Sequence, residues 1–368
     1  MIADATPMDL ETIALRGLRV ADCRLQGQLM PFTLRGAPGP TGPRVAPEGH
    51  SLRYSAIAAL GLGRRPVEVQ RAVLGGRDAA WLARACLQAA RGSDDGGAVA
   101  LSVWAAGEVA GTADDDLLVL LLEAVRGASI PTVECAWAVL AGLASPAAGS
   151  ARLAAEGMAL LLTHQNRAGV FPHSLPRAGG VRGHVSCFAD QVYPVQALAR
   201  FAARTGDNRA LTGADAAARW LVSLQGAAGQ WWWHYDARTG DVVERYPVYS
   251  VHQYAMAPMA LSELAAAGGR DHDAPVHRGL AWLQTHPECV EPLVAPDLGV
   301  VWRKVGRREP PKAARTVAAL AGRVSPRISV PGVDRLWPPG RVDYECRPYE
   351  LGWLLYASAG PVGQGGAG

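Results

Sequence analysis

The chain has 368 residues, of which 49% are hydrophobic and 19% are charged, a balance typical of a globular protein with a large core. Its net charge is only +3 and its basic residues form no stripe, so we expect no nucleic-acid partner. The longest apolar runs, such as residues 117–122, are too short to span a bilayer. An acidic N-terminus and six scattered cysteines predict a cytoplasmic protein with no integral membrane segment.

Three parts follow one another along the chain. Residues 1–50 form an N-terminal segment whose Pro/Gly-rich stretch, residues 35–50, is expected to be a loop or lid. Residues 51–358 are expected to form a single helical domain with almost no strand. Residues 359–368, rich in glycine, are expected to be a disordered tail.

Twelve segments of the central part are expected to be helices, and they are of two alternating kinds. Those of the first kind are apolar all round, as buried helices are: 51–62, 97–111, 131–143, 187–203, 249–268 and 344–357. Those of the second kind keep one polar face: 77–91, 114–127, 151–165, 213–225, 273–286 and 311–324. The alternation predicts an all-α fold, an (α/α)6 toroid of six inner and six outer helices. An irregular helical bundle is the alternative.

The stretch GQWWWHYD, residues 229–236, lies between the outer segment that ends near Gln225 and the next inner segment. Three adjacent tryptophans cannot share one buried face, so at least one indole is expected to line a cavity. One of the others is expected to pack against Gln225. Residues 235–249 predict a short hairpin with its turn at 238–241.

Two stretches of the chain form an internal repeat. Residues 159–173 and 219–234 each contain a helix ending in glutamine, a glycine turn and aromatic residues, and residues 280–288 begin a third, degenerate copy. Together with residues 127–171, this pattern resembles the QW-type repeat of class II terpenoid cyclases of the squalene–hopene kind, which also occurs in protein prenyltransferase β-subunits. The resemblance covers about residues 130–284. It implies a toroid that cyclises or rearranges an isoprenoid or similar apolar small molecule by an acid-initiated reaction.

The chain lacks the intact acid motif and zinc-ligand set of those families. The nearest match to the cyclase DxDD acid motif is ADDD, residues 113–116, which lacks the first acid and opens an outer helix. We interpret it as a helix cap, because acids there bind free N–H groups and meet the positive end of the helix dipole. A prenyltransferase zinc site needs aspartate, cysteine and histidine, and no spacing in the chain indicates such a set. No metal and no cofactor are therefore expected.

Polar side chains recur where the inner helices begin, and those ends are expected to meet at one mouth of the barrel. The candidate catalytic residues are Asp190, Glu345 and His252. Burial raises the pKa of a carboxyl group and a nearby arginine lowers it, so Asp190 and Glu345 are expected to differ in protonation, one serving as the acid and the other as a base or orienting group. The candidate substrate-binding residues are Arg53, Glu134, Tyr193, Trp231, Trp232, Trp233, His234, Tyr249, Gln253, Tyr254 and Arg347.

Two other functions fit the same residues. A carbohydrate-active (α/α)6 enzyme, whether glycosidase, lyase or epimerase, would use the polar groups at the mouth for a hydroxyl-rich ligand and paired carboxylates for catalysis. A non-catalytic binding protein would keep the cyclase fold without its acid. The sequence leaves the substrate, the product and the oligomeric state open.

Overall fold

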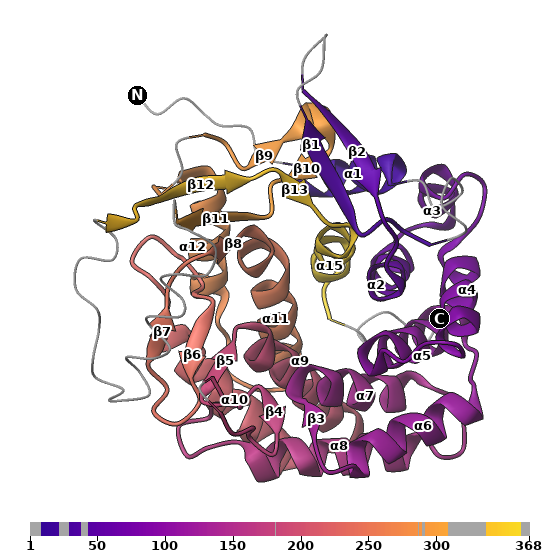
Figure 1. Ribbon diagram of the computed structural model, residues 1–368. Helices are drawn as coiled ribbons and strands as arrows, with labels where there is room; N and C mark the ends of the chain where they lie inside the picture. The colour runs from indigo at the N-terminus through magenta and orange to yellow at the C-terminus, as the bar shows by residue number, and fades with distance from the viewer. Residues whose placement is uncertain are drawn as a thin grey trace.

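The computed structural model describes residues 9–21, 29–37, 43–180, 182–285, 287–288, 291–307 and 336–361. A closed ring of inner helices surrounds the barrel axis, each packed against the next, and the last packs against the first (Figure 1). In ring order these are α2 (Leu52–Leu62), α5 (Gly96–Ala110), α7 (Thr132–Ala144), α9 (Ala189–Thr205), α11 (Ala257–Ala266) and α15 (Pro348–Ser358). The predicted inner segments are confirmed.

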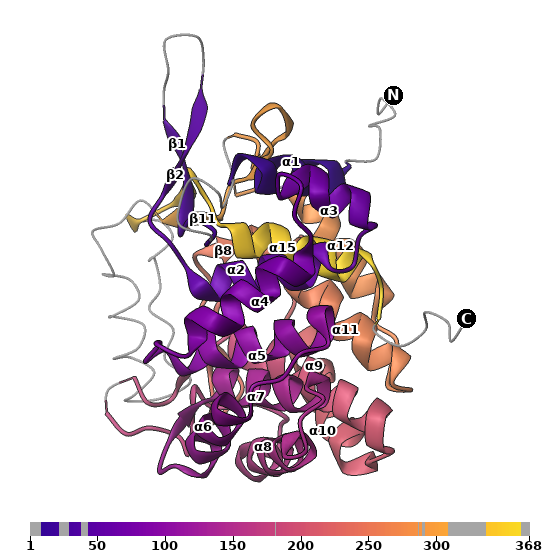
Figure 2. The same ribbon diagram turned by 90° about the vertical axis from the view of Figure 1, so that its right-hand side faces the viewer.

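A second layer of helices surrounds this ring. It contains α4 (Ala79–Ala90), α6 (Asp115–Arg126), α8 (Ser150–His164), α10 (Asn208–Ser223) and α12 (Asp273–Thr285), as the alternation predicted. The predicted outer helix at 311–324 and most of the expected tail, 362–368, lie outside the described residues. Helix α1 (Leu10–Val20) packs against α15 and also contacts the short helix α3 (Val67–Val73) (Figure 2). An α/α toroid is therefore the fold of the described chain.

The distribution of apolar residues explains which helices lie inside. In α5 every residue from 97 to 106 is buried, so this helix has no face for solvent. In α6 the buried residues are Leu117, Leu118, Leu121 and Val125, which form one stripe. Glycines bring the inner helices close together. A Cβ atom on Gly61 of α2 would lie 2.1 Å from the carbonyl oxygen of Gly352 in α15.

Short strands lead into the inner helices α7, α9 and α15 and into the segment before α11. Within the described residues the strands form three antiparallel three-stranded sheets and two two-stranded ones. The strands are β1 (Thr33–Ala37), β2 (Arg44–Glu48), β3 (Ile130–Pro131), β4 (Ser174–Leu175), β5 (Val185–Cys187), β6 (His234–Asp236), β7 (Val242–Glu244), β8 (Val248–Tyr249), β9 (Val294–Ala295), β10 (Val300–Val301), β11 (Lys304–Arg307), β12 (Pro339–Asp343) and β13 (Glu345–Cys346). The π-helical turn η2 (His252–Met256) joins β8 to α11, and the 3-10 turn η3 (Pro296–Leu298) joins β9 to β10.

The strands correct one expectation and confirm another. Residues 35–50 were expected to be a loop or lid, but β1 and β2 pair with each other and β1 also pairs with β13. The partner of Leu34 in that last pairing is Cys346, near the opposite end of the chain, so the local sequence could not indicate it. The hairpin predicted at 235–249 is present as β6 and β7.

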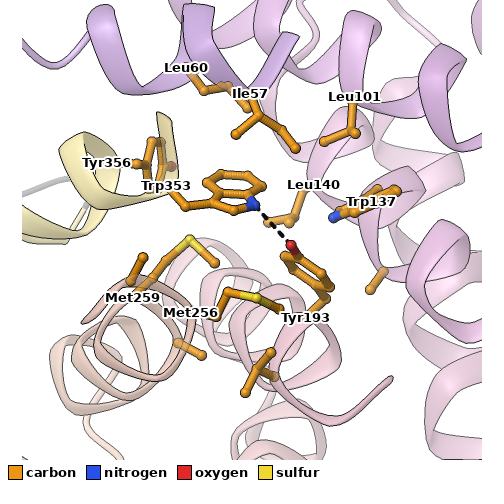
Figure 3. Packing of buried hydrophobic residues seen from close by; sticks show 14 of the residues in the cluster. Ile57, Leu60, Leu101, Trp137, Leu140, Tyr193, Met256, Met259, Trp353 and Tyr356 are labelled. Carbon is orange, nitrogen blue, oxygen red and sulfur yellow. Dashed lines mark hydrogen bonds between the residues drawn. The ribbon is translucent and has the colours of Figure 1, made fainter. Parts of the chain in front are cut away.

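Side chains fill the centre of the barrel. Leu60 of α2, Leu140 of α7, Tyr193 of α9 and Trp353 of α15 meet there, and the Trp353 indole donates a 2.8 Å hydrogen bond to the Tyr193 hydroxyl (Figure 3). Among the described residues, the centre of the toroid is therefore a packed core. No helix in the described ranges has both the length and the apolar character needed to cross a membrane.

Candidate active site

A cavity of about 300 Å³ lies where the N-terminal ends of inner helices meet. Helices α2, α7, α9 and α15, the turn η2 and the segments that lead into them all contribute to its lining, so these ends converge on one mouth. The lining residues are Arg53, Tyr54, Ile57, Val133, Trp137, Ala189, Tyr193, Trp233, Tyr249, His252, Met256, Arg303, Arg347 and Tyr349. Six of the proposed site residues are therefore cavity residues: Arg53, Tyr193, Trp233, Tyr249, His252 and Arg347.

Six of the fourteen lining residues are tyrosine or tryptophan, and their rings form a large part of the cavity wall. The ring centroids of Trp233 and Tyr249 are 5.3 Å apart, and those of Trp137 and Tyr193 are 5.1 Å apart. Edge-to-face pairs at these distances hold each other in place, so the wall presents fixed ring faces to the cavity.

Three guanidinium groups share the cavity with these rings. Arg303 lies with its Cζ atom 4.8 Å from the centre of the Tyr249 ring. Arg347 donates a 2.8 Å hydrogen bond to the Tyr54 hydroxyl, and Arg53 lies 5.5 Å from the centre of the Trp137 ring. Arg303 was not among the sequence candidates, because it reaches the mouth from the strand segment between β10 and β11. A cavity with flat rings and several guanidiniums suits a ligand that has both an apolar face and a negative charge.

A buried carboxyl group lies behind two of these arginines. Glu350 of α15 is fully buried, its Oε1 is 3.4 Å from Arg303 Nε, and its Oε2 accepts a hydrogen bond from the Arg347 backbone N–H. Burial raises the pKa of Glu350 to about 7, although Arg303 and Arg347 lower it. Glu350 was not a sequence candidate, although its place as the third residue of a helix that begins with proline is a typical capping position.

Two carboxylates share the guanidinium of Arg53. Asp95 is the N-cap of α5, and its two carboxylate oxygens accept hydrogen bonds from Arg53 Nε at 2.7 and 2.9 Å. The other nitrogen, Arg53 Nη2, donates both to Asp95 and to Glu134 of α7, the latter at 2.7 Å. Burial raises the pKa of Asp95, but the hydrogen bonds from Arg53 and from the Ala98 N–H outweigh it and leave that pKa lowered. The structure thus places a carboxylate pair beside a cavity-lining arginine. Asp95 was not a sequence candidate.

The three tryptophans have three different surroundings. Trp231 is completely buried against Phe188, and Trp232 contacts Tyr246 and the Arg245 guanidinium. Trp233 is the one that lines the cavity. The expectation that at least one indole reaches the mouth agrees with this position, whereas Trp231 and Trp232 have packing roles.

The glutamines of the internal repeat tie the outer helices together. Gln165 donates hydrogen bonds to the carbonyl oxygens of Gly169 and Gly213, at 3.0 and 2.9 Å. Gln225 donates at the same distances to Gly229 and to the backbone of Pro275, on the next outer helix. The Gln225 amide thus donates to backbone carbonyls, and the expected packing of a tryptophan against Gln225 stays a prediction.

Gln191 and Gln253 form a second pair of equivalent glutamines, and both bind backbone groups instead of lining the cavity. Gln191 exchanges two hydrogen bonds with the backbone of Phe171, and Gln253 accepts one from the Trp231 N–H. Tyr254 follows Gln253 and is buried away from the cavity lining. Gln191 and Gln253 thus fasten the turn after each outer helix to the next inner helix.

Asp190 is fully buried beside the cavity residue Ala189 and bonded to His173. The His173 Nδ1 atom lies 3.0 and 3.2 Å from its two carboxylate oxygens, and Asp190 also accepts from the Cys187 N–H at 2.7 Å. The hydrogen bond to Asp190 raises the pKa of His173. His173 was missed because its partner lies beyond two intervening strands and the proline before it gave no sign of a site.

Three other candidates, His252, Glu345 and His234, differ in their surroundings. Burial lowers the pKa of His252 to about 3, so this cavity residue is neutral. Glu345 pairs with Arg35 and Arg347 at 3.0 and 3.4 Å. Burial raises its pKa, but Arg347 and Arg35 outweigh that effect and the pKa of Glu345 is lowered. His234 is buried and stacks on Trp233.

The ADDD stretch behaves as a helix cap. Asp114 accepts a hydrogen bond from the Leu117 N–H at the start of α6 and pairs with Arg91 at 2.7 Å. It is not part of the cavity lining.

Fold and site together define an (α/α)6 toroid with an aromatic and cationic cavity at one mouth. Neither the protein-family models nor the curated proteins contain a match to the sequence. Solved structures do resemble it. An unsaturated glucuronyl hydrolase specific for heparin superposes with a TM-score of 0.54 at 14% identity, covering 95% of this chain and 96% of that one.

Two further structures give the same result. A glycosyl hydrolase of family 88 from Bacteroides vulgatus has a TM-score of 0.53 at 11% identity, over 96% of this chain and 98% of its own. An unsaturated glucuronyl hydrolase from a Bacillus species, described as responsible for glycosaminoglycan degradation, has a TM-score of 0.51 at 13% identity, over 95% and 94%. At these identities the likeness shows the fold.

Proposed function

We propose that this protein is an enzyme acting on a saccharide that carries a carboxylate, a uronic acid residue, bound in the mouth cavity. The observation that carries the proposal is the presence of Arg53, Arg303 and Arg347 among aromatic rings in one cavity of about 300 Å³. That volume is at the lower end of the usual range for small-molecule sites, enough for a sugar unit.

Each part of a uronic acid has a matching group in the cavity. Trp233 and Tyr249 offer flat faces to the apolar side of a sugar ring. Arg303 and Arg347 offer N–H groups to the carboxylate, and guanidiniums bind carboxylates with two parallel hydrogen bonds. The solved structures of similar fold include hydrolases named for glucuronyl substrates, which supports this substrate class.

The carboxylate pair Asp95 and Glu134 is the proposed source of acid and base catalysis. Both contact the same guanidinium nitrogen, so their oxygens lie within two hydrogen-bond lengths, about 6 Å. Cleavage of a glycosidic bond uses two carboxyl groups close together. In this proposal Glu345 holds Arg347 in place, and His252 is a neutral hydrogen-bonding group in the wall.

The isoprenoid substrate implied by the sequence resemblance fits the cavity less well. An apolar chain would remove water from the parts of the three guanidiniums that face the cavity and would accept no hydrogen bond there. That is unfavourable even though Arg53 and Arg347 also have carboxylate partners. Only an isoprenoid with an anionic end, a prenyl diphosphate, would satisfy them.

Calorimetric titration with three ligands tests the proposal. These are a glucuronic acid disaccharide, the same disaccharide with its carboxyl group reduced to an alcohol, and a prenyl diphosphate. We expect the acidic disaccharide to bind at least about tenfold more tightly than the neutral one, since a hydrogen bond to a charged group contributes about 1.5–3 kcal/mol, and to be turned over as followed by mass spectrometry. Preference for the prenyl diphosphate would overturn the proposal in favour of isoprenoid chemistry. Binding without turnover would contradict the enzyme assignment and support a saccharide-binding protein.

A further inference from the structure

Three potential metal ligands from separate parts of the chain meet beside the mouth. His173 precedes β4, Cys187 ends β5 and Asp190 lies in the first turn of α9. One ligand atom from each, a ring nitrogen, a thiol sulfur and a carboxylate oxygen, lies within 4.8 Å of the other two.

The internal repeat shows that the fold does not require these residues. Trp233 has the place in the second copy that His173 has in the first, and Tyr249 and His252 have the places of Cys187 and Asp190. The flanking glutamines make equivalent bonds in both copies, Gln191 to Phe171 and Gln253 to Trp231, so the positions correspond. In the second copy the three positions form part of the aromatic cavity wall.

The same positions in the first copy hold three side chains with metal-binding chemistry. Packing is satisfied by Trp233, Tyr249 and His252 in one copy, so it does not explain why histidine, cysteine and aspartate stand together in the other. A ligand that needs all three does explain it.

We propose that His173, Cys187 and Asp190 bind a divalent transition metal ion, with Zn²⁺ preferred. Imidazole, thiolate and carboxylate are the ligands that zinc takes in proteins, at about 2.0–2.3 Å. Ligand atoms around a tetrahedral ion then lie roughly 3.3–3.8 Å apart, given those bond lengths. The His173–Asp190 distances of 3.0 and 3.2 Å are already close to this, and a small movement of the Cys187 side chain completes the set.

The site has one open side. Asp190 is fully buried and Cys187 is half-buried, whereas 66% of the His173 side chain is exposed. Three protein ligands with an exposed face leave a fourth position for water, as in catalytic rather than structural zinc sites. On binding, the ion replaces the thiol proton of Cys187, which is released to solvent. This proposal departs from the expectation of a metal-free protein and does not depend on the saccharide proposal.

The test uses the full-length protein with Zn²⁺ and Co²⁺ and no saccharide. Zinc is titrated against a chromogenic chelator, and cobalt spectra are recorded for a thiolate-to-metal charge-transfer band. The variants are Cys187→Ser and His173→Ala. The matched control is Cys135→Ser, which removes another buried thiol, bonded to the Gly157 carbonyl in α8. Far-UV circular dichroism verifies that every variant is folded.

We expect one zinc ion per chain in the wild type and in Cys135→Ser, with a charge-transfer band for cobalt. Cys187→Ser should abolish that band and His173→Ala should weaken zinc binding at least about tenfold, since each removes a direct ligand. Folded wild-type protein that takes up no stoichiometric zinc would overturn the proposal. So would a cobalt band that persists in Cys187→Ser, because the thiolate would then come from elsewhere.

Discussion

Arg303 and Glu350 form an ion pair, Nε to Oε1 at 3.4 Å, in which only Arg303 lines the mouth cavity. Glu350 is fully buried, and burial raises its pKa to about 7. The net charge beside the cavity therefore changes near neutral pH. Protonated Glu350 is neutral and does not offset the positive charges of Arg303 and Arg347. Ionised Glu350 carries a negative charge that offsets part of them.

The first prediction is that binding of an acidic saccharide weakens as the pH rises from about 6 to about 8, on either side of the Glu350 pKa. A uronic acid is ionised throughout this range, as carboxyl groups with ordinary pKa values are, so the change comes from the protein. Titration calorimetry of wild type and Glu350→Gln checks this. The variant should bind as the wild type does at low pH and lose most of the slope. An equal slope in both proteins would assign the pH dependence to another group.

The same residue gives a stability readout. The folded-state pKa of Glu350 is raised above its ordinary value of 4.5. Its favourable contribution to the free energy of unfolding is therefore complete below pH 4.5 and is lost as the pH rises through about 7. Glu350→Gln should therefore unfold at a higher urea concentration than wild type above pH 7, and this advantage should shrink as the pH falls. A variant that is less stable at high pH would show that the ion pair with Arg303 outweighs the cost of burying the charge.

The second prediction separates two neighbouring tryptophans. Trp233→Ala should weaken saccharide binding by about 5- to 100-fold, taking as a guide the roughly 1–3 kcal/mol that a nucleic-acid base gains by stacking on an aromatic ring. Trp231→Ala should instead lower the free energy of unfolding by about 3–5 kcal/mol, since Trp231 is completely buried. Denaturant unfolding and calorimetry on both variants measure this. If Trp233→Ala bound saccharide normally, the aromatic wall would have no part in recognition.

The third prediction concerns the carboxylate pair at Arg53. Asp95→Asn and Glu134→Gln should each lower kcat by about 10²–10⁴, the usual contribution of a general acid or base, with little change in KM. Glu156→Gln is the matched control. Glu156 is likewise a carboxylate paired with arginine, with Arg126 at 2.5 Å and Arg152 at 2.8 Å, but it lies on α8 in the outer layer. Full activity in both mouth variants would remove Asp95 and Glu134 from the proposed chemistry.

The fourth prediction tests the glutamines of the repeat. Gln165→Leu and Gln225→Leu should each lower the free energy of unfolding by about 1–3 kcal/mol, because two partly buried carbonyl groups lose their donor. The two losses should be similar, since the bonds are equivalent in the two copies. Thermal unfolding measures the comparison. Unequal losses would mean that the two copies differ in packing around the glutamine.

The toroid could be derived from the sequence because its evidence is local. Each inner helix lacks a polar face and each outer helix has one, and this difference can be read within each segment by itself. The positions of Arg53, Trp233, His252 and Arg347 near one mouth followed from the same alternation, since successive antiparallel helices bring every second N-terminus to the same end. Asp114 as a helix cap followed from the capping rule alone.

Only the tertiary structure decided which residues far apart in the chain contact one another. Arg303 reaches the cavity from a strand segment, Asp95 meets Glu134 through Arg53, and His173 meets Asp190 across two short strands. The hydrophobic periodicity of the sequence does not predict such contacts, because they depend on how turns of irregular length fold back over the mouth. The sequence by itself determined the ring of helices; only the packing of the segments between them determined which side chains share the cavity.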